Sequence, residues 1–118
     1  MNKILPFFLI VFFSCTAHSE EKIRLLEISK NLNEPWGMTF IDDNNLLITE
    51  KTGEIMRINI ETGEKFSIDH ELDFFYFGQG GLLDILYKDN YVYVTYSEDR
   101  EEGKSSTSIA RGLYNDEK

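Results

Sequence analysis

The chain has 118 residues, a formal net charge of −9 and 42% hydrophobic residues. This length allows one domain at most. The acidic balance argues against binding to nucleic acid or to an anionic membrane surface, because both carry negative charge. With a single cysteine, Cys15, no disulfide framework can form within the chain.

Residues 1–19 have the three parts of a secretory signal peptide. Lys3 supplies a positive start, residues 4–13 form an apolar run, and Ala17-His18-Ser19 is a small-residue ending suited to cleavage. The apolar run is too short to span a bilayer as a helix, which needs about 20 apolar residues. We therefore expect a mature protein that begins near residue 20, in the periplasm or outside the cell. Lipid attachment at Cys15 is the alternative.

Residues 34–64 alternate between short apolar segments and tight turns. Turns are predicted where Asn, Asp and Gly cluster, because Asn and Gly adopt the positive φ angles of hairpin turns at little steric cost. The pattern predicts strands at 38–41, 46–49 and 55–60, separated by turns at 42–45, 52–53 and 61–63. A series of hairpins with no helical spacing between them indicates an all-β meander.

The pattern restarts after residue 76. Gly78-Gln79-Gly80-Gly81 leads into predicted strands at 82–86, 91–97 and 107–113, with a turn at 87–90 and a polar loop at 98–106. The strand at 91–97 is apolar or aromatic on both faces and should be covered on both sides. Two units of about 40 residues, each a small antiparallel sheet, are typical of β-propeller blades. A two-sheet sandwich is the alternative.

Two motifs, in this order, resemble the soluble glucose/sorbosone dehydrogenases, quinoproteins that use pyrroloquinoline quinone. The first is Pro35-Trp36-Gly37-Met38-Thr39-Phe40 with Leu46-Leu47-Ile48-Thr49-Glu50 and Gly53, and the second is Gly78-Gln79-Gly80-Gly81-Leu82-Leu83-Asp84. The resemblance implies a six-bladed β-propeller, of which this chain would be the N-terminal part, with about two four-stranded antiparallel blades. Residues 20–118 would be an incomplete propeller domain, with a first blade at about 32–70 and a partial second blade at about 77–113.

The resemblance also implies a reaction. The family oxidises aldose sugars at the anomeric carbon to lactones, and the quinone, used with calcium, accepts the hydride. The family's catalytic histidine lies on a later segment, so this chain is expected to be an inactive N-terminal fragment with no catalytic residue or metal ligand of its own. His70 is expected to be an ordinary loop histidine. A non-catalytic secreted propeller that binds a ligand or a protein is the alternative, because fold alone does not settle function.

Gln79 is the one binding residue that the resemblance carries across. The corresponding glutamine of the family lies near the central opening of the propeller, where sugar and quinone meet. An amide donates and accepts hydrogen bonds, which suits sugar hydroxyls and quinone oxygens, and flanking glycines allow close approach. Alternatively, the glycines only permit a bend and Gln79 ties the carbonyls of the loop. The stretch precedes a strand and not a helix, which excludes a dinucleotide-binding loop.

An incomplete propeller should leave apolar sheet uncovered. The residues expected to face water are Leu83, Ile85, Val92, Val94 and Tyr96. By contrast, Trp36 is expected to be a buried aromatic anchor. The segment 22–28 is expected to be a strand that closes the ring in the parent protein and has no such partner here.

Overall fold

The computed structural model describes residues 20–115, and the predicted signal peptide lies outside them. Seven strands form within the described range. The same range contains no helix of the length and apolar character that a membrane span requires. The predicted all-β class is therefore confirmed for this part of the chain.

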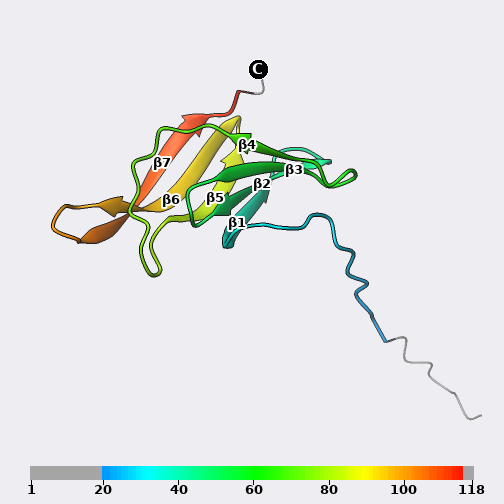
Figure 1. Ribbon diagram of the computed structural model, residues 1–118. Coiled ribbons are helices and arrows are strands. Elements are labelled where there is room, and N and C mark those ends of the chain that lie inside the picture. Colours follow the sequence, from blue (N-terminus) through cyan, green and yellow to red (C-terminus); the bar gives the residue numbers. More distant parts are fainter. Residues whose placement is uncertain (1–19, 116–118) are drawn as a thin grey trace, which may run out of the picture.

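The first sheet contains four antiparallel strands in the order β1-β2-β3-β4 (Figure 1). They are β1 (Pro35–Phe40), β2 (Asn45–Glu50), β3 (Ile55–Asn59) and β4 (Lys65–Ile68). The turns lie where Asn, Asp and Gly cluster. In the β1–β2 turn, the Asp42 carboxylate accepts the N–H groups of Asn44 and Asn45, both at 2.7 Å, as aspartate commonly does in tight turns.

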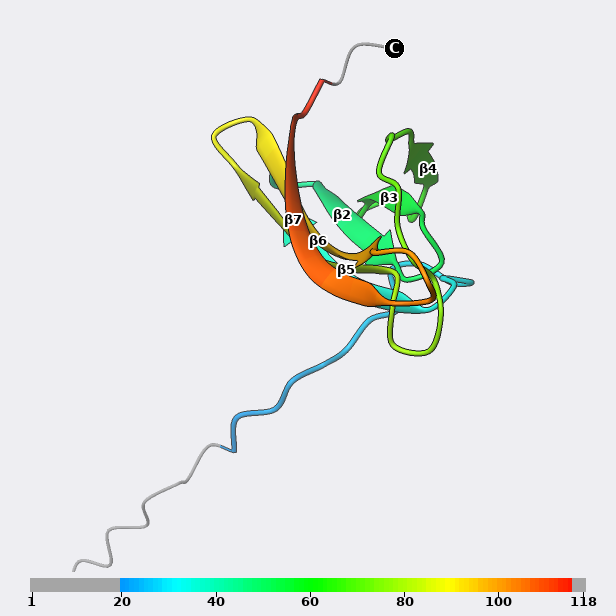
Figure 2. The ribbon, with the colours of Figure 1, turned by 90° about the vertical axis from the view of Figure 1, so that its left-hand side faces the viewer.

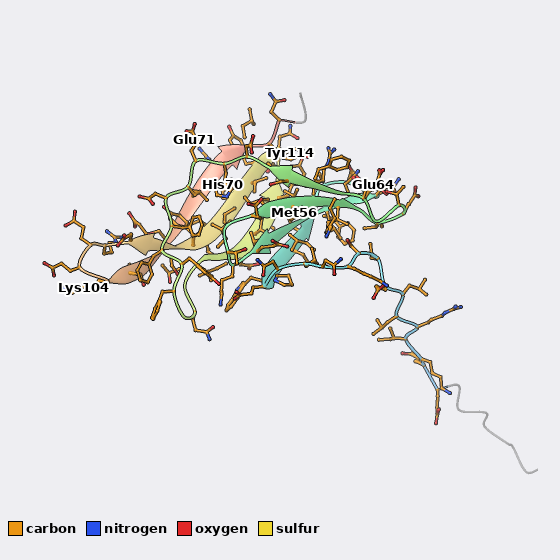
Figure 3. All side chains as sticks on the ribbon, viewed as in Figure 1. Met56, Glu64, His70, Glu71, Lys104 and Tyr114 are labelled. Carbon is orange, nitrogen blue, oxygen red and sulfur yellow. The ribbon has the colours of Figure 1, made fainter. Side chains whose placement is uncertain are left out.

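The second sheet contains three antiparallel strands in the order β5-β6-β7. They are β5 (Leu82–Lys88), β6 (Tyr91–Asp99) and β7 (Ser105–Leu113). The β6–β7 hairpin is longer than predicted, since Asp99 pairs with Ser105 inside the segment expected to be a polar loop. Its tip carries Lys104 and projects beyond the sheet (Figure 3). Backbone ladder bonds need no apolar side chains, so a polar hairpin can extend into solvent.

The two sheets pack against each other, with β5 in contact with β1 and β2. Two threonine hydroxyls join these strands. Thr49, fully buried in β2, accepts the N–H of Gly37 at 3.1 Å and donates to the carbonyl of Leu83. Thr39 in β1 accepts the N–H of Tyr87 at 3.2 Å. Figure 2 shows the strands of the second sheet curving past the first.

The hydrophobic core lies between the sheets. Its buried members are Leu47, Ile55, Leu82, Ile85 and Val94, each at most 5% exposed. The expectation that Ile85 and Val94 face water is wrong, because the first sheet covers the face of the second sheet on which they lie. Leu83, Val92 and Tyr96 were expected to face water as well, but all three are half-buried, and Val92 and Tyr96 pack against this core. Burial of one such aliphatic side chain contributes about 1.5–3 kcal/mol.

The expected uncovered apolar surface lies on the opposite face of the second sheet. Leu86, Ile109 and Leu113 are 54%, 67% and 67% exposed, and the strand register places them on the face turned away from the core. Trp36 is half-exposed in β1. The expectation of a buried anchor at this position is therefore wrong.

The segment before β1 forms no strand within the described residues. Ile23 and Leu25 are each 89% exposed, and the segment runs away from both sheets (Figures 1 and 2). Its expected pairing with a last blade stays a prediction.

Candidate functional site

Gln79 lies in a four-residue turn that leads into β5. The N–H of Gly80 donates to the carbonyl of Phe77 at 2.8 Å. Gly78 has a φ of 59°, whereas Gln79 keeps a negative φ. A positive φ at the second residue only is the geometry of a type II′ turn, which glycine at that position favours. The glycine therefore suits the turn that presents Gln79.

The side chain of Gln79 is exposed at the tip of this turn. Within residues 20–115 its amide makes no hydrogen bond. Gln79 therefore does not donate hydrogen bonds to the carbonyls of its own loop, which was the alternative to a binding role. Both the donor and the acceptor of the amide are available to a ligand.

The loop that carries the turn is fixed to the end of β6. The N–H of Phe75 donates to the carbonyl of Ser97 at 2.7 Å, and the N–H of Ser97 donates to the carbonyl of Gly81 at 2.9 Å. Ser97 is buried. Bonds on both sides of the turn hold its base, whereas the turn residues Phe77, Gly78 and Gln79 are exposed.

Lys51, in the β2–β3 turn, holds the same loop from the other side. Its backbone carbonyl accepts the N–H of Leu82 at 3.2 Å. Its ammonium donates to the carbonyl of Gly78 at 2.9 Å and lies 2.6 Å from the carboxylate of Glu34. A Cβ built on Gly81 would lie 2.0 Å from the Lys51 carbonyl oxygen. Only glycine permits this close approach.

Tyr76 completes the contact on the loop side. Its hydroxyl donates to Glu34 at 2.7 Å, and its ring centroid lies 5.8 Å from the Lys51 ammonium. Hydrogen bonds from Lys51 and then from Tyr76 hold the pKa of Glu34 below its ordinary value. The bond to the Glu34 carboxylate raises the pKa of Tyr76, because a phenolate there would face a negative charge.

The sequence pattern does not indicate Glu34, Lys51 or Tyr76 as partners. Lys51 and Gly78 are 27 residues apart, and Glu34 and Tyr76 are 42 residues apart. Such contacts follow from the packing of the two sheets and have no local signature. Gly81 is the one available signal, because glycine next to a predicted strand indicates close approach of another backbone.

His70 occupies a different part of the molecule. It follows β4, and Figure 3 shows it on the connecting segment with Glu71 and near Tyr114. Its Nε2 lies 2.6 Å from the carbonyl of Gly53, and its Nδ1 accepts the N–H of Leu72 at 3.2 Å. Both ring nitrogens therefore have backbone partners, as befits a loop histidine with a structural role.

A cavity of about 570 Å³ opens beside His70, between the two sheets. Leu47, Ile55 and Val94 belong to its lining, together with Glu71 and Arg111. No residue of the Gln79 turn lines it. Across residues 20–115, no group of three or more His, Cys, Asp or Glu side chains is placed to hold a metal ion.

Comparison with known sequences gives a family match. The model of the family described as "Glucose / Sorbosone dehydrogenase" matches residues 32–118. The chain is 29% identical over 96 residues to the aldose sugar dehydrogenase YliI of Escherichia coli (strain K12), covering 76% of this chain and 26% of that protein.

Comparison with solved structures agrees. A crystal structure of a glucose dehydrogenase superposes with a TM-score of 0.71 at 29% identity, over 77% of this chain and 28% of that one. The PQQ-bound aldose sugar dehydrogenase of Streptomyces coelicolor superposes with a TM-score of 0.70 at 28% identity, over 80% and 28%. The predicted fold class, the first part of a β-propeller, is confirmed by these likenesses. The chain spans about a quarter of the length of these relatives.

Proposed function

The chain belongs to the glucose/sorbosone dehydrogenase family, and from this we propose that it is the N-terminal part of a secreted quinoprotein. The parent protein oxidises aldose sugars at the anomeric carbon to lactones with pyrroloquinoline quinone. The family match over residues 32–118 supports the reaction class. A relative that is an aldose sugar dehydrogenase in its PQQ-bound form supports the sugar and the cofactor.

The exposed amide of Gln79 is the observation that carries this proposal within the chain itself. Gln79 lies on an anchored turn between glycines, with no hydrogen-bond partner among the described residues. It can therefore donate to a quinone or sugar oxygen and accept from a sugar hydroxyl. We assign Gln79 to the binding of sugar or quinone, where its amide orients the ligand.

Neither Lys51, beside the Gln79 turn, nor His70, in another part of the molecule, is placed to take a proton from a substrate. The Lys51 ammonium is already paired with the Glu34 carboxylate, and His70 has backbone partners on both ring nitrogens. We place the base that takes the hydroxyl proton outside this chain, in the part of the parent protein that the chain does not span. When bound, the quinone supplies the hydride acceptor that no side chain can provide.

Calcium and the remaining quinone contacts are assigned to the parent protein in the same way. Residues 20–115 offer no cluster of metal ligands, so the ion would be held by residues elsewhere.

We further propose that residues 1–19 are a cleaved signal peptide that directs the protein to the periplasm or out of the cell, and that the segment 22–28 pairs with the last blade.

Reconstitution of the full-length protein with pyrroloquinoline quinone and calcium tests the function. The expected result is oxidation of aldoses, measured with an artificial electron acceptor, and lactone as product. The 118-residue chain alone, treated identically, is expected to show no turnover. Full-length protein that binds the quinone yet oxidises no aldose would refute the enzyme and favour a secreted propeller that only binds its ligand.

A further inference from the structure

Lys51 acts on the peptide unit that precedes Gln79. Its ammonium can only donate hydrogen bonds, and it donates one to the carbonyl of Gly78 at 2.9 Å. That carbonyl belongs to the peptide bond between Gly78 and Gln79, the central peptide of the type II′ turn. A rotation of this peptide would interconvert type II′ and type I′ turns, which differ in the φ of the residue at Gln79. The bond from Lys51 opposes this rotation.

Lys51 is itself held in place, unlike an ordinary surface lysine. Its side chain is 14% exposed, and its N–H donates to the carbonyl of Glu34 at 2.9 Å. The Glu34 carboxylate that pairs with the ammonium is fixed in turn by the hydroxyl of Tyr76. By contrast, in the pair Lys104–Glu102 at the hairpin tip the side chains are 73% and 80% exposed. Lys51 is therefore a fixed donor.

We propose that Lys51 is a positioning residue for Gln79, acting through the Gly78 carbonyl with Glu34 and Tyr76 behind it. The proposal rests on the proposed function, in which Gln79 contacts the sugar or the quinone. Without the ammonium, the turn samples several orientations, and ligand binding must first select one of them. Such ordering lowers affinity without changing the groups that contact the ligand.

The substitution Lys51→Met removes the ammonium and keeps an unbranched side chain of similar length. In the full-length protein without ligand, we expect hydrogen exchange at the Gly80 amide to accelerate about tenfold, because this amide closes the turn. In the reconstituted enzyme we expect the KM for the aldose to rise about three- to tenfold, with a smaller change in kcat. Lys51→Arg keeps the charge and should restore part of both effects.

Lys65→Met is the matched control. The Lys65 ammonium also donates to backbone carbonyls, those of Lys30 at 2.6 Å and Asn31 at 3.2 Å. It lies at the β3–β4 end of the first sheet, opposite the β2–β3 turn that contains Lys51. This control should change neither Gly80 exchange nor the KM, although it removes the same type of contact.

Two outcomes separate this proposal from the function on which it rests. If Gln79→Ala raises the KM while Lys51→Met leaves Gly80 exchange and the KM unchanged, the positioning role is wrong and the function stands. If Gln79→Ala leaves aldose oxidation unchanged, the role of Gln79 fails. In that case, hydrogen exchange at the Gly80 amide of Lys51→Met still tests the effect of Lys51 on the turn. Should Lys51→Met not fold, Glu34→Gln must still accelerate Gly80 exchange, and no acceleration would overturn the proposal.

Discussion

Gly37 in β1 packs directly against the backbone of Asp84 in β5. A Cβ built on Gly37 would lie 2.7 Å from Asp84 Oδ1 and 2.9 Å from Asp84 Cα. The two sheets approach so closely here that no side chain fits between them. This contact sets the spacing of β1 and β5, and so the position of the turn that precedes β5.

We therefore expect Gly37→Ala to destabilise the protein. The added methyl group must push β5 away or distort β1, at a cost of about 1–3 kcal/mol. Gly112→Ala is the control, because a Cβ at Gly112 meets nothing within 4 Å. Chemical denaturation of both variants measures the difference. Equal free energies of unfolding would contradict the close packing described for β1 and β5.

Thr49→Val tests the hydrogen bonds that join the sheets. The substitution keeps the shape of the side chain, but it leaves the N–H of Gly37 and the carbonyl of Leu83 without the hydroxyl partner. An unsatisfied buried group costs about 1–3 kcal/mol, so we expect a loss of that size in the free energy of unfolding. Thr107→Val, on the exposed β7 strand, should stay within about 0.5 kcal/mol. An unchanged free energy of unfolding in Thr49→Val would show that the hydroxyl contributes little to stability.

Much of the fold is predictable from the sequence because hairpin turns have local signatures. Asn, Asp and Gly mark the turns, and β-branched and aromatic residues fill the strands between them. β4 (Lys65–Ile68) has no such signature, since four residues with one lysine and one serine show no clear pattern. It forms because β3 offers a paired edge.

Burial was less predictable than strand position. Ile85 and Val94 pack on the first sheet, although the alternation of a strand does not say which face meets a neighbour. Trp36 is half-exposed because it shares the outer face of β1 with the exposed residues Met38 and Phe40. The Lys51–Glu34 pair depends on the packing of distant segments, which no motif encodes.

The Tyr76–Glu34 contact predicts a shift that can be titrated. The hydrogen bond to Glu34 raises the pKa of Tyr76 above its ordinary value of 10.0. Replacing Glu34 by Gln removes the negative charge, so the pKa of Tyr76 should fall towards 10.0. The pKa of Tyr76 is measured from the phenolate absorbance that is lost in the Tyr76→Phe variant. The titration is done once with Glu34 present and once with the Glu34→Gln substitution. An unchanged pKa would mean that the two groups do not interact in solution.

The same pair gives a pH dependence of stability with a defined sign. The pKa of Glu34 is lower in the folded state than its ordinary value of 4.5. Its contribution is therefore present above pH 4.5 and is lost as the pH falls through the folded pKa. The stability difference between the protein and Glu34→Gln should shrink on acidification. A difference that stays constant down to the acid transition would contradict the depressed pKa.

Gln79→Ala in the full-length, quinone-reconstituted protein tests the central claim most directly. Loss of the amide should reduce kcat/KM for aldose oxidation by about tenfold, which corresponds to about 1.4 kcal/mol of binding, while the free energy of unfolding stays unchanged because the amide has no partner among the described residues. Unaltered aldose oxidation in this variant, with the quinone bound, would contradict the assignment of the turn as part of the sugar and quinone site.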